Sequence, residues 1–212
     1  SRGTGHLARQ TAAALAADTV VHGVTRHQLL LDERVRYTKR NSSAAILIDG
    51  DKDPSLIDQI KGLVEALSHP GSDPGLCVAD VVPEEVIAFG RRAKQEVVNQ
   101  EEARRLAAAH GILLVGLGGD ESGVIGALAA VGLAASGDDG RYVLAGRSRS
   151  LAGLQPVAAV LDAGVASVQT PDGQPIEDGL VLVDKLRPAR RGGRPVVIVE
   201  WDGRYWQPLK LD

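Results

Sequence analysis

The chain has 212 residues, of which 44% are hydrophobic and 24% charged, and this composition is typical of a globular protein with a substantial buried core. The formal net charge is -3 and the pI is near 6.0, so no global basic field could hold a nucleic acid by neutralising its phosphates, and any such contact must be local. The single cysteine, Cys77, excludes an internal disulfide framework and a cysteine-based zinc site.

No stretch approaches the roughly 18 uninterrupted apolar residues of a membrane helix, and no basic-then-apolar leader opens the chain. These features, with the lone cysteine, predict a cytoplasmic protein without a membrane partner. The chain begins at Ser1 and contains no methionine, which indicates that residues are missing upstream or that the chain was processed.

Predicted helices and strands alternate through the first part of the chain. The Ala-rich segment 7–17 predicts a helix, and segments 19–24 and 44–49 predict β-branched strands. Segment 53–67 has the apolar period of an amphipathic helix. The helix is predicted to begin at Asp53-Pro54, because Asp supplies a cap and Pro is favourable at the first helical position.

A cluster of Gly, Pro and Ser at 69–75 predicts a loop, and the alternation then resumes. The later predicted elements are a strand at 76–81, helices at 83–98 and 100–111, a strand at 112–118, a loop-to-helix segment at 119–136 and a strand at 141–146. From about residue 150 the sequence is rich in turns and predicts a small β module, with a two-residue hairpin centred on Asp202-Gly203. The pattern as a whole predicts an α+β protein.

The opening stretch "SRGTGHLARQ" places Gly3 and Gly5 at the start of a helix. Free N–H groups and the helix dipole favour an anion there, and glycines allow close approach of a phosphate. The alternative is a simple entry turn, with His6 as a surface or capping residue.

The connection between the first two predicted strands carries many hydrogen-bonding side chains. Arginine and lysine suit phosphate, while Asn and Ser orient water, ribose or a base edge. A solvated basic turn is the alternative; adjacency to the Gly-rich helix start favours convergence of both on one polyanion. The side chains concerned are Arg26, His27, Gln28, Tyr37, Thr38, Lys39, Arg40, Asn41 and Ser42.

The third stretch, "GLGGDESGVIGALAAVGLAAS", combines glycines with two adjacent carboxylates. It matches neither a Walker lysine loop nor a dinucleotide fingerprint. The alternative to a ligand site is a helix whose small residues press closely on a sheet.

Three motifs, "RGTGHLA", "RHQLLLDERVRYTKRNSSAAI" and "SGVIGALAAVGL", resemble in order three signatures of the agmatidine synthase family, which modifies the wobble cytidine of isoleucine tRNA. The resemblance covers roughly residues 1–147. It implies a kinase-like nucleotide-binding part at 1–82, a ferredoxin-like part at 83–149 that helps to form an amine site, and leaves 150–212 as the small β module.

The resemblance also implies ATP and Mg as cofactors. The predicted cofactor-binding residues are Arg2, Gly3, Thr4, Gly5, His6, Arg26, Lys39, Arg40, Asn41 and Ser42. The predicted substrate-binding residues, for which a small cationic amine is the expected ligand, are Asp120, Glu121, Gly123, Ile125 and Gly126. The family's magnesium-binding Asp-Asp-Thr-Asp run would precede Ser1, so no catalytic residue or metal ligand is assigned.

The predicted function is an ATP-binding, Mg-dependent phosphoryl-transfer or ligase-type enzyme of unknown substrate. The alternative is a noncatalytic nucleotide- or small-ligand-binding regulatory protein that keeps the family pockets. Binding of tRNA is predicted to be weak, because the net charge is acidic and no cysteine ribbon is present. The local exception is an arginine group that is otherwise a solvated turn: Arg187, Arg190, Arg191 and Arg194.

Overall fold

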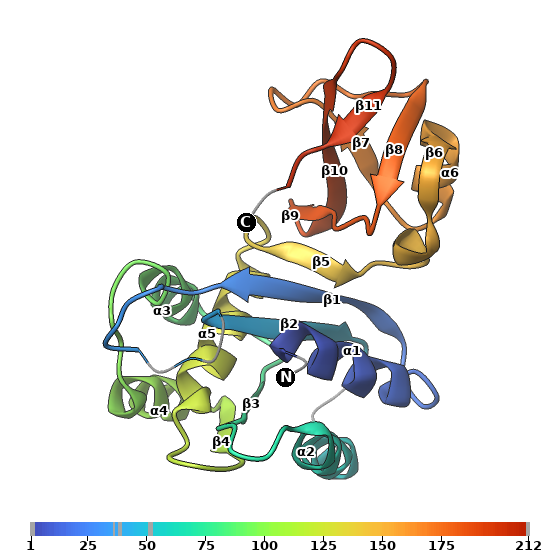
Figure 1. The fold of residues 1–212 in the computed structure, drawn as a ribbon. Helices are drawn as coiled ribbons and strands as arrows, with labels where there is room; N and C mark the ends of the chain where they lie inside the picture. Colours follow the sequence, from blue (N-terminus) through green and yellow to red (C-terminus); the bar gives the residue numbers. More distant parts are fainter. Residues whose placement is uncertain (1–2, 36, 38–39, 51–52, 211–212) are drawn as a thin grey trace.

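A long mixed sheet runs through the computed structural model, which describes residues 3–35, 37, 40–50 and 53–210 (Figure 1). Its strands follow the order β2-β1-β5-β9-β10-β11-β8-β6, with β7 paired to β10. Helices cover the β2–β1–β5 end, and a second, two-stranded sheet is formed by β3 and β4. The predicted α+β class is confirmed, and no helix in the described part of the chain is long and apolar enough to cross a membrane.

The β2–β1–β5 end carries one helix on each face. Val24 of β1 lies opposite Ile46 of β2 in an antiparallel ladder, and it packs against Ala8 and Ala12 of α1. Neighbouring positions of β2 point to the other face, where Ser43 meets α5 beside Gly126. The bounds are α1 Thr4–Leu15, β1 Val21–Gln28, β2 Ser42–Ile48, α5 Gly123–Ala135 and β5 Arg141–Leu144.

The intervening elements form a layer of helices and the short β3–β4 sheet. Asp53 caps α2 as expected, because its carboxylate accepts from the backbone N–H of Ser55 at 3.2 Å. Phe89 of α3 and Leu133 of α5 belong to the main core of this layer. The bounds are α2 Pro54–Leu67, β3 Gly75–Val78, α3 Glu84–Arg92, α4 Gln100–Ala109 and β4 Leu113–Gly116.

Helices α3 and α5 approach each other closely through glycine. A Cβ added to Gly132 would lie 2.1 Å from the carbonyl oxygen of Val86, and one added to Gly90 would lie 2.9 Å from that of Ala129. Both positions therefore need glycine for packing of one helix on another, whereas the alternative to a ligand site predicted from sequence was packing of the small residues of α5 on a sheet.

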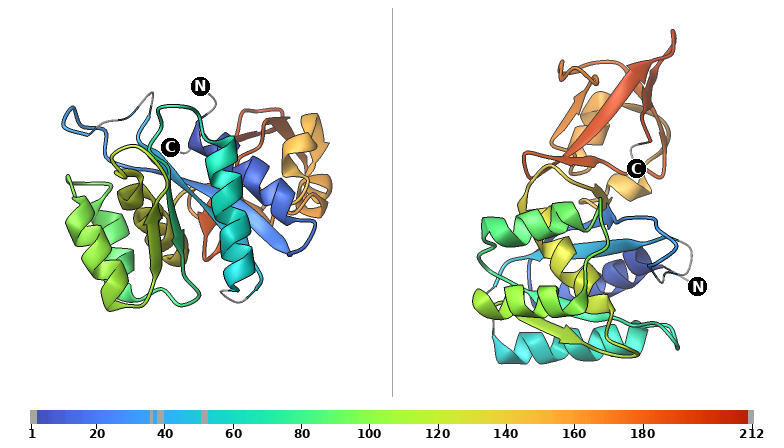
Figure 2. Two further views of the ribbon diagram at one scale, coloured as in Figure 1. Left: turned by 90° about the horizontal axis from the view of Figure 1, so that it is seen from below. Right: turned by 90° about the vertical axis from the view of Figure 1, so that its left-hand side faces the viewer.

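The C-terminal β module lies at one end of the molecule, away from α2 and α4 (Figure 2). Its core consists mostly of valine, as expected for strands buried on one face. The bounds are η1 Ser148–Ser150, β6 Ala152–Pro156, α6 Val157–Asp162, β7 Ser167–Gln169, β8 Leu180–Asp184, β9 Ala189–Arg191, β10 Arg194–Trp201 and β11 Trp206–Pro208.

The module joins the rest of the protein at a seam, which comprises the β5–β9 pair and the side chains of Arg190 and Tyr142. Arg141 lies opposite Ala189 in this ladder. Arg190 is buried and donates to the carbonyl oxygens of Ala134 and Gly193, at 3.0 and 2.8 Å, and to the hydroxyl of Tyr142. Arg190 is therefore a structural side chain and not part of a phosphate-binding surface, which corrects one member of the predicted arginine group.

Three local predictions differ from the structure. The helix expected over 83–98 ends at Arg92, because the next residues form tight turns and the carbonyl of Ala93 accepts from Leu30 N. Helix α6 was not predicted. The β10–β11 hairpin exists, but four residues separate its strands, because the carboxylate of Asp202 accepts from the backbone N–H groups of Arg204 and Tyr205.

The division at 1–82, 83–149 and 150–212 stays a prediction, as do the kinase-like and ferredoxin-like assignments. Strand pairs cross both proposed boundaries: β3 pairs with β4, β1 pairs with β5, and β5 pairs with β9.

Candidate functional site

A broad cleft of about 2410 Å³ opens beneath α1 and extends along β2, past the start of α5, to the C-terminal β module. Within the described part of the sheet β2 pairs only with β1, so its other edge faces this cleft. The cleft brings together the Gly-rich helix start, the β1–β2 connection and the α5 start. The predicted residues that line it are Gly3, Thr4, Gly5, His6, Arg26, Arg40, Asn41, Ser42, Asp120, Gly123, Ile125 and Gly126.

Other predicted residues stand apart from this set. Arg2, Thr38 and Lys39 lie outside the described residues. Glu121 does not line the cleft; its carboxylate is paired with Arg104, and its backbone adopts a φ of 60°.

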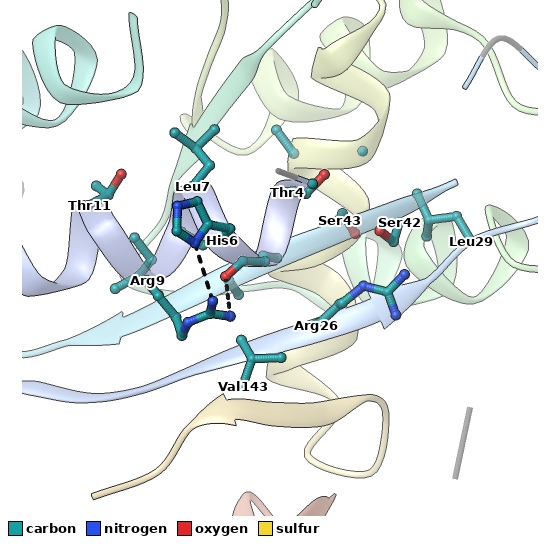
Figure 3. Close-up of a pocket in the computed structure, with 18 of the residues that line it drawn as sticks. Thr4, His6, Leu7, Arg9, Thr11, Arg26, Leu29, Ser42, Ser43 and Val143 are labelled. Carbon is teal, nitrogen blue, oxygen red and sulfur yellow. Dashed lines mark hydrogen bonds between the residues drawn. The ribbon is translucent and has the colours of Figure 1, made fainter. Parts of the chain in front are cut away.

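The first turn of α1 lies directly over Arg26 (Figure 3). Gly3 is the N-cap, no side chain caps the helix, and its carbonyl accepts from the N–H of His6 at 2.8 Å. A Cβ added to Gly5 would lie 3.6 Å from Cδ of Arg26, an ordinary contact, and one added to Gly3 would meet nothing within 4 Å. The protein's own packing therefore does not require glycine here, and close approach of a ligand remains as a reason for it.

The β1–β2 connection uses part of its polar capacity to hold itself closed. Asn41 donates from Nδ2 to the carbonyl of Leu30 at 2.8 Å, and its own carbonyl accepts from Nε2 of Gln28. Asn41 therefore lines the cleft while its amide supports the loop. His27 points to the opposite face of the sheet, is fully buried and meets Asp139 at 2.9 Å, so it is not a cleft residue.

The start of α5 combines packing and open positions. A Cβ at Gly123 would lie 2.0 Å from the carbonyl oxygen of Asp73, so this glycine is needed for packing. A Cβ at Gly126 would lie 3.7 Å from that of Ser43, an ordinary contact, so Gly126 is not. Asp120 accepts from the backbone N–H of Ser122 at 2.9 Å and is the one predicted carboxylate in the cleft.

Several cleft residues were missed from sequence. Arg9 donates to the carbonyl of Gly5 at 2.9 Å, and burial, followed by the charges of Arg149 and Arg187, lowers its pKa. The i to i+4 spacing from Gly5 could have indicated Arg9. Arg187 belongs to the arginine group predicted from sequence, whereas Arg149 comes from a distant segment and carried no such signal.

Three buried hydroxyls of residues that line the cleft have no hydrogen-bond partner, those of Thr11, Ser43 and Ser68. Thr11 of α1 is 1% exposed and Ser43 of β2 is 5% exposed. A buried hydroxyl without a partner costs free energy. Buried hydroxyls near the cleft are therefore left without hydrogen bonds, whereas Arg190 and Tyr142 at the seam are hydrogen-bonded.

No group of three or more His, Cys, Asp or Glu side chains in the described part of the chain is placed to hold a metal ion. Mg²⁺ is commonly held by one or two carboxylates together with substrate phosphates, so the Mg that the resemblance implies stays a prediction. No chemical step is assigned to it.

No family model matches the sequence, and no curated protein matches it. Among solved structures, the fold is similar to those of enzymes that act on tRNA. One is a tRNA fluorescent labeling enzyme, at 23% identity and a TM-score of 0.53. Another is TiaS in complex with an isoleucine tRNA and ATP, at 22% identity and a TM-score of 0.53.

Each match covers 61% of this chain and 32% of the other, so the chain spans about a third of the length of these structures. At this identity the similarity establishes a TiaS-like fold. The sequence resemblance to the agmatidine synthase family is thus supported at the level of the fold.

Proposed function

We propose that this protein uses ATP to modify an RNA of the tRNA class, and that the ATP phosphates bind in the cleft at the start of α1. The observation that carries the proposal is that two separate segments, the helix start at Gly3 and the β1–β2 connection, meet on one cleft. The TiaS-like fold supports it, because the similar structures are of enzymes that act on tRNA, one of them with ATP bound.

The electrostatics of the α1 start suit an anion. The first turn of α1 contains no acidic residue and no capping side chain, so the positive end of the helix dipole is not offset within the helix. Arg26 lies below this turn and Arg40 lines the same cleft. A guanidinium binds phosphate through two parallel hydrogen bonds, so both side chains suit the β- and γ-phosphates.

The expected weakness of tRNA binding rests on the net charge and on the absence of a cysteine ribbon, and the similarity to tRNA enzymes does not support it. A cationic amine as second substrate also stays a prediction. Asp120 would be its carboxylate in the cleft, because Glu121 is engaged by Arg104.

Calorimetric titration with ATP tests the nucleotide site. The parent should bind ATP, and Arg26→Gln should bind about tenfold or more weakly, since a charge-assisted contact contributes roughly 1.5–3 kcal/mol. Arg105→Gln is the matched control, because Arg105 is an exposed arginine on α4 outside the cleft. No ATP binding by the parent at millimolar nucleotide, or equal affinities for parent and Arg26→Gln, would contradict the proposal.

Turnover separates an enzyme from a regulatory binder. The rate at which the parent converts ATP to its nucleotide product should rise when tRNA is added. Binding of ATP with no turnover in the presence of tRNA would instead favour a noncatalytic nucleotide-binding protein.

A further inference from the structure

Three arginines from three segments line the cleft. Arg9 comes from α1, Arg149 from η1, and Arg187 from the loop between β8 and β9. They lie close enough together that the charges of Arg149 and Arg187, in addition to burial, lower the pKa of Arg9. We call these three residues the arginine cluster. Its members come from α1, from η1 and from the C-terminal β module.

The backbone holds the members of the cluster in place. Next to Arg187, Leu186 is 3% exposed in the module core and the carbonyl of Pro188 accepts from Tyr142 N at 2.7 Å. Two residues before Arg149, the backbone N–H of Arg147 donates to the carbonyl of Ala163 at 2.7 Å. The backbone positions that carry Arg149 and Arg187 are therefore anchored by the fold.

The charges of the cluster are not neutralised within the described part of the chain. No ion pair recorded there joins Arg9, Arg149 or Arg187 to a carboxylate. Asp184 lines the same cleft and is exposed, as is Lys185 beside it. Guanidiniums that repel one another favour binding of an anion of more than one charge.

The geometry points to the phosphate backbone of RNA as the ligand: we propose that the arginine cluster binds phosphate groups of the RNA substrate, an inference that rests on the proposed function. Arg149 and Arg187 come from η1 and from the β8–β9 loop, so the cluster extends the positive charge of the cleft from the α1 start toward the C-terminal β module, where a further phosphate of a long polyanion would bind. The cleft volume of 2410 Å³ is also well above that of a pocket for one small ligand, about 300 to 1,000 Å³.

The test compares two double variants that each remove two positive charges from the intact chain. Arg149→Gln with Arg187→Gln removes most of the cluster. Arg105→Gln with Arg204→Gln removes two exposed arginines that do not line the cleft and do not belong to the predicted arginine group. Circular dichroism and thermal melting establish that both variants fold. The probes are a labelled tRNA transcript, followed by fluorescence anisotropy over a series of salt concentrations, and ATP, followed by calorimetry.

The cluster variant should bind tRNA about tenfold or more weakly, and the slope of log K against log salt should decrease in magnitude by about 1 to 2, since each phosphate contact contributes about 0.7 to 0.9. The control should stay within about twofold of the parent. ATP affinity should be equal in all three proteins. Equal tRNA binding by the cluster variant and the control, or absence of tRNA binding by the parent, would overturn the inference.

Two further outcomes separate this inference from the proposed function. If the cluster variant loses ATP affinity as strongly as tRNA affinity, the cluster belongs to the nucleotide site and the inference is wrong. If the parent binds tRNA through the cluster but binds no ATP, the inference stands and the proposed function fails.

Discussion

The cleft beneath α1 and the seam between β5 and β9 adjoin the same sheet, but they differ in how far their buried polar side chains are hydrogen-bonded. At the seam, the buried guanidinium of Arg190 donates to two carbonyls and to Tyr142, whose hydroxyl in turn donates to the carbonyl of Gly193 at 2.8 Å. In the cleft, the hydroxyls of Thr11 and Ser43 have no hydrogen-bond partner. Within the described part of the chain, no carboxylate forms an ion pair with the arginine cluster.

The difference separates stability from binding. Satisfied polar groups hold the C-terminal β module on the rest of the protein, and their loss leaves buried groups unpaired. Unsatisfied buried hydroxyls contribute no such stabilisation, and the charges of the arginine cluster are available to an anion. Changes at the seam should therefore alter stability, and changes in the cleft should alter ligand affinity.

The largest expected effect is that of Arg190→Met. It removes the guanidinium that donates to the hydroxyl of Tyr142 and removes one of the donors to each of the carbonyls of Ala134 and Gly193, and it removes a cation–π contact of 5.7 Å over the Tyr142 ring. We expect a loss of about 3 kcal/mol in the free energy of unfolding, measured by urea denaturation, and a Tm lower by roughly 6–12 °C. Arg194→Met, at an exposed position, is the control; a loss at Arg190 no greater than that of the control would contradict the structural role.

The second effect compares two glycines of α5. Gly132→Ala places a Cβ 2.1 Å from the carbonyl oxygen of Val86, so α3 and α5 must separate, and the expected loss is about 2 kcal/mol. Gly126→Ala makes only an ordinary contact at the cleft and should stabilise the helix by about 0.5–1 kcal/mol. Equal losses in chemical denaturation would show that both glycines serve packing.

Sequence reasoning succeeded where the structure is local and failed where it is long-range. The bounds of α2 followed from Asp53 and the apolar period of the helix, because capping depends on residues close in the chain. The burial of Arg190 could not be predicted, because its partners Ala134 and Tyr142 lie about fifty residues away and the neighbouring arginines indicate a solvated turn.

The candidate site shows the same division. The glycines before α1 and the donors of the β1–β2 connection could be identified, because each is a compact motif. The arginine cluster could not, because only the fold brings Arg9, Arg149 and Arg187 together. The pairing of Glu121 with Arg104 likewise depends on the packing of α4 beside α5.

The third prediction concerns the dependence of stability on pH, through the buried side chain of His27. Burial lowers the pKa of His27 below 6.5, and this outweighs the opposing hydrogen bond from Asp139. Below about pH 6.5 the unfolded chain therefore takes up a proton that the folded protein does not. The free energy of unfolding should be highest above about pH 6.5 and should decrease as the pH falls below this value.

The slope for this one proton is at most about 1.4 kcal/mol per pH unit. Denaturation between pH 7.5 and 5 should show a smaller decrease for His27→Gln than for the parent. An identical decrease in both proteins would exclude His27 as its source.

The smallest effect is that of Thr11→Val in the cleft. The change keeps the shape of the side chain and removes a buried hydroxyl that has no partner, so stability should stay equal or rise by up to about 1 kcal/mol. A loss of more than about 0.5 kcal/mol in urea denaturation would show that the hydroxyl is satisfied in the folded protein and that the contrast with the seam does not hold.

The central claim is that the cleft beneath α1 binds ATP while the C-terminal β module does not. Hydrogen exchange of the intact protein with and without ATP tests it most directly, because bound phosphates should protect the backbone amides at the start of α1. The account predicts slower exchange at residues 4–7 and 40–44 and unchanged exchange across β8, β10 and β11. Unchanged exchange at residues 4–7, or protection confined to the C-terminal β module, would contradict it.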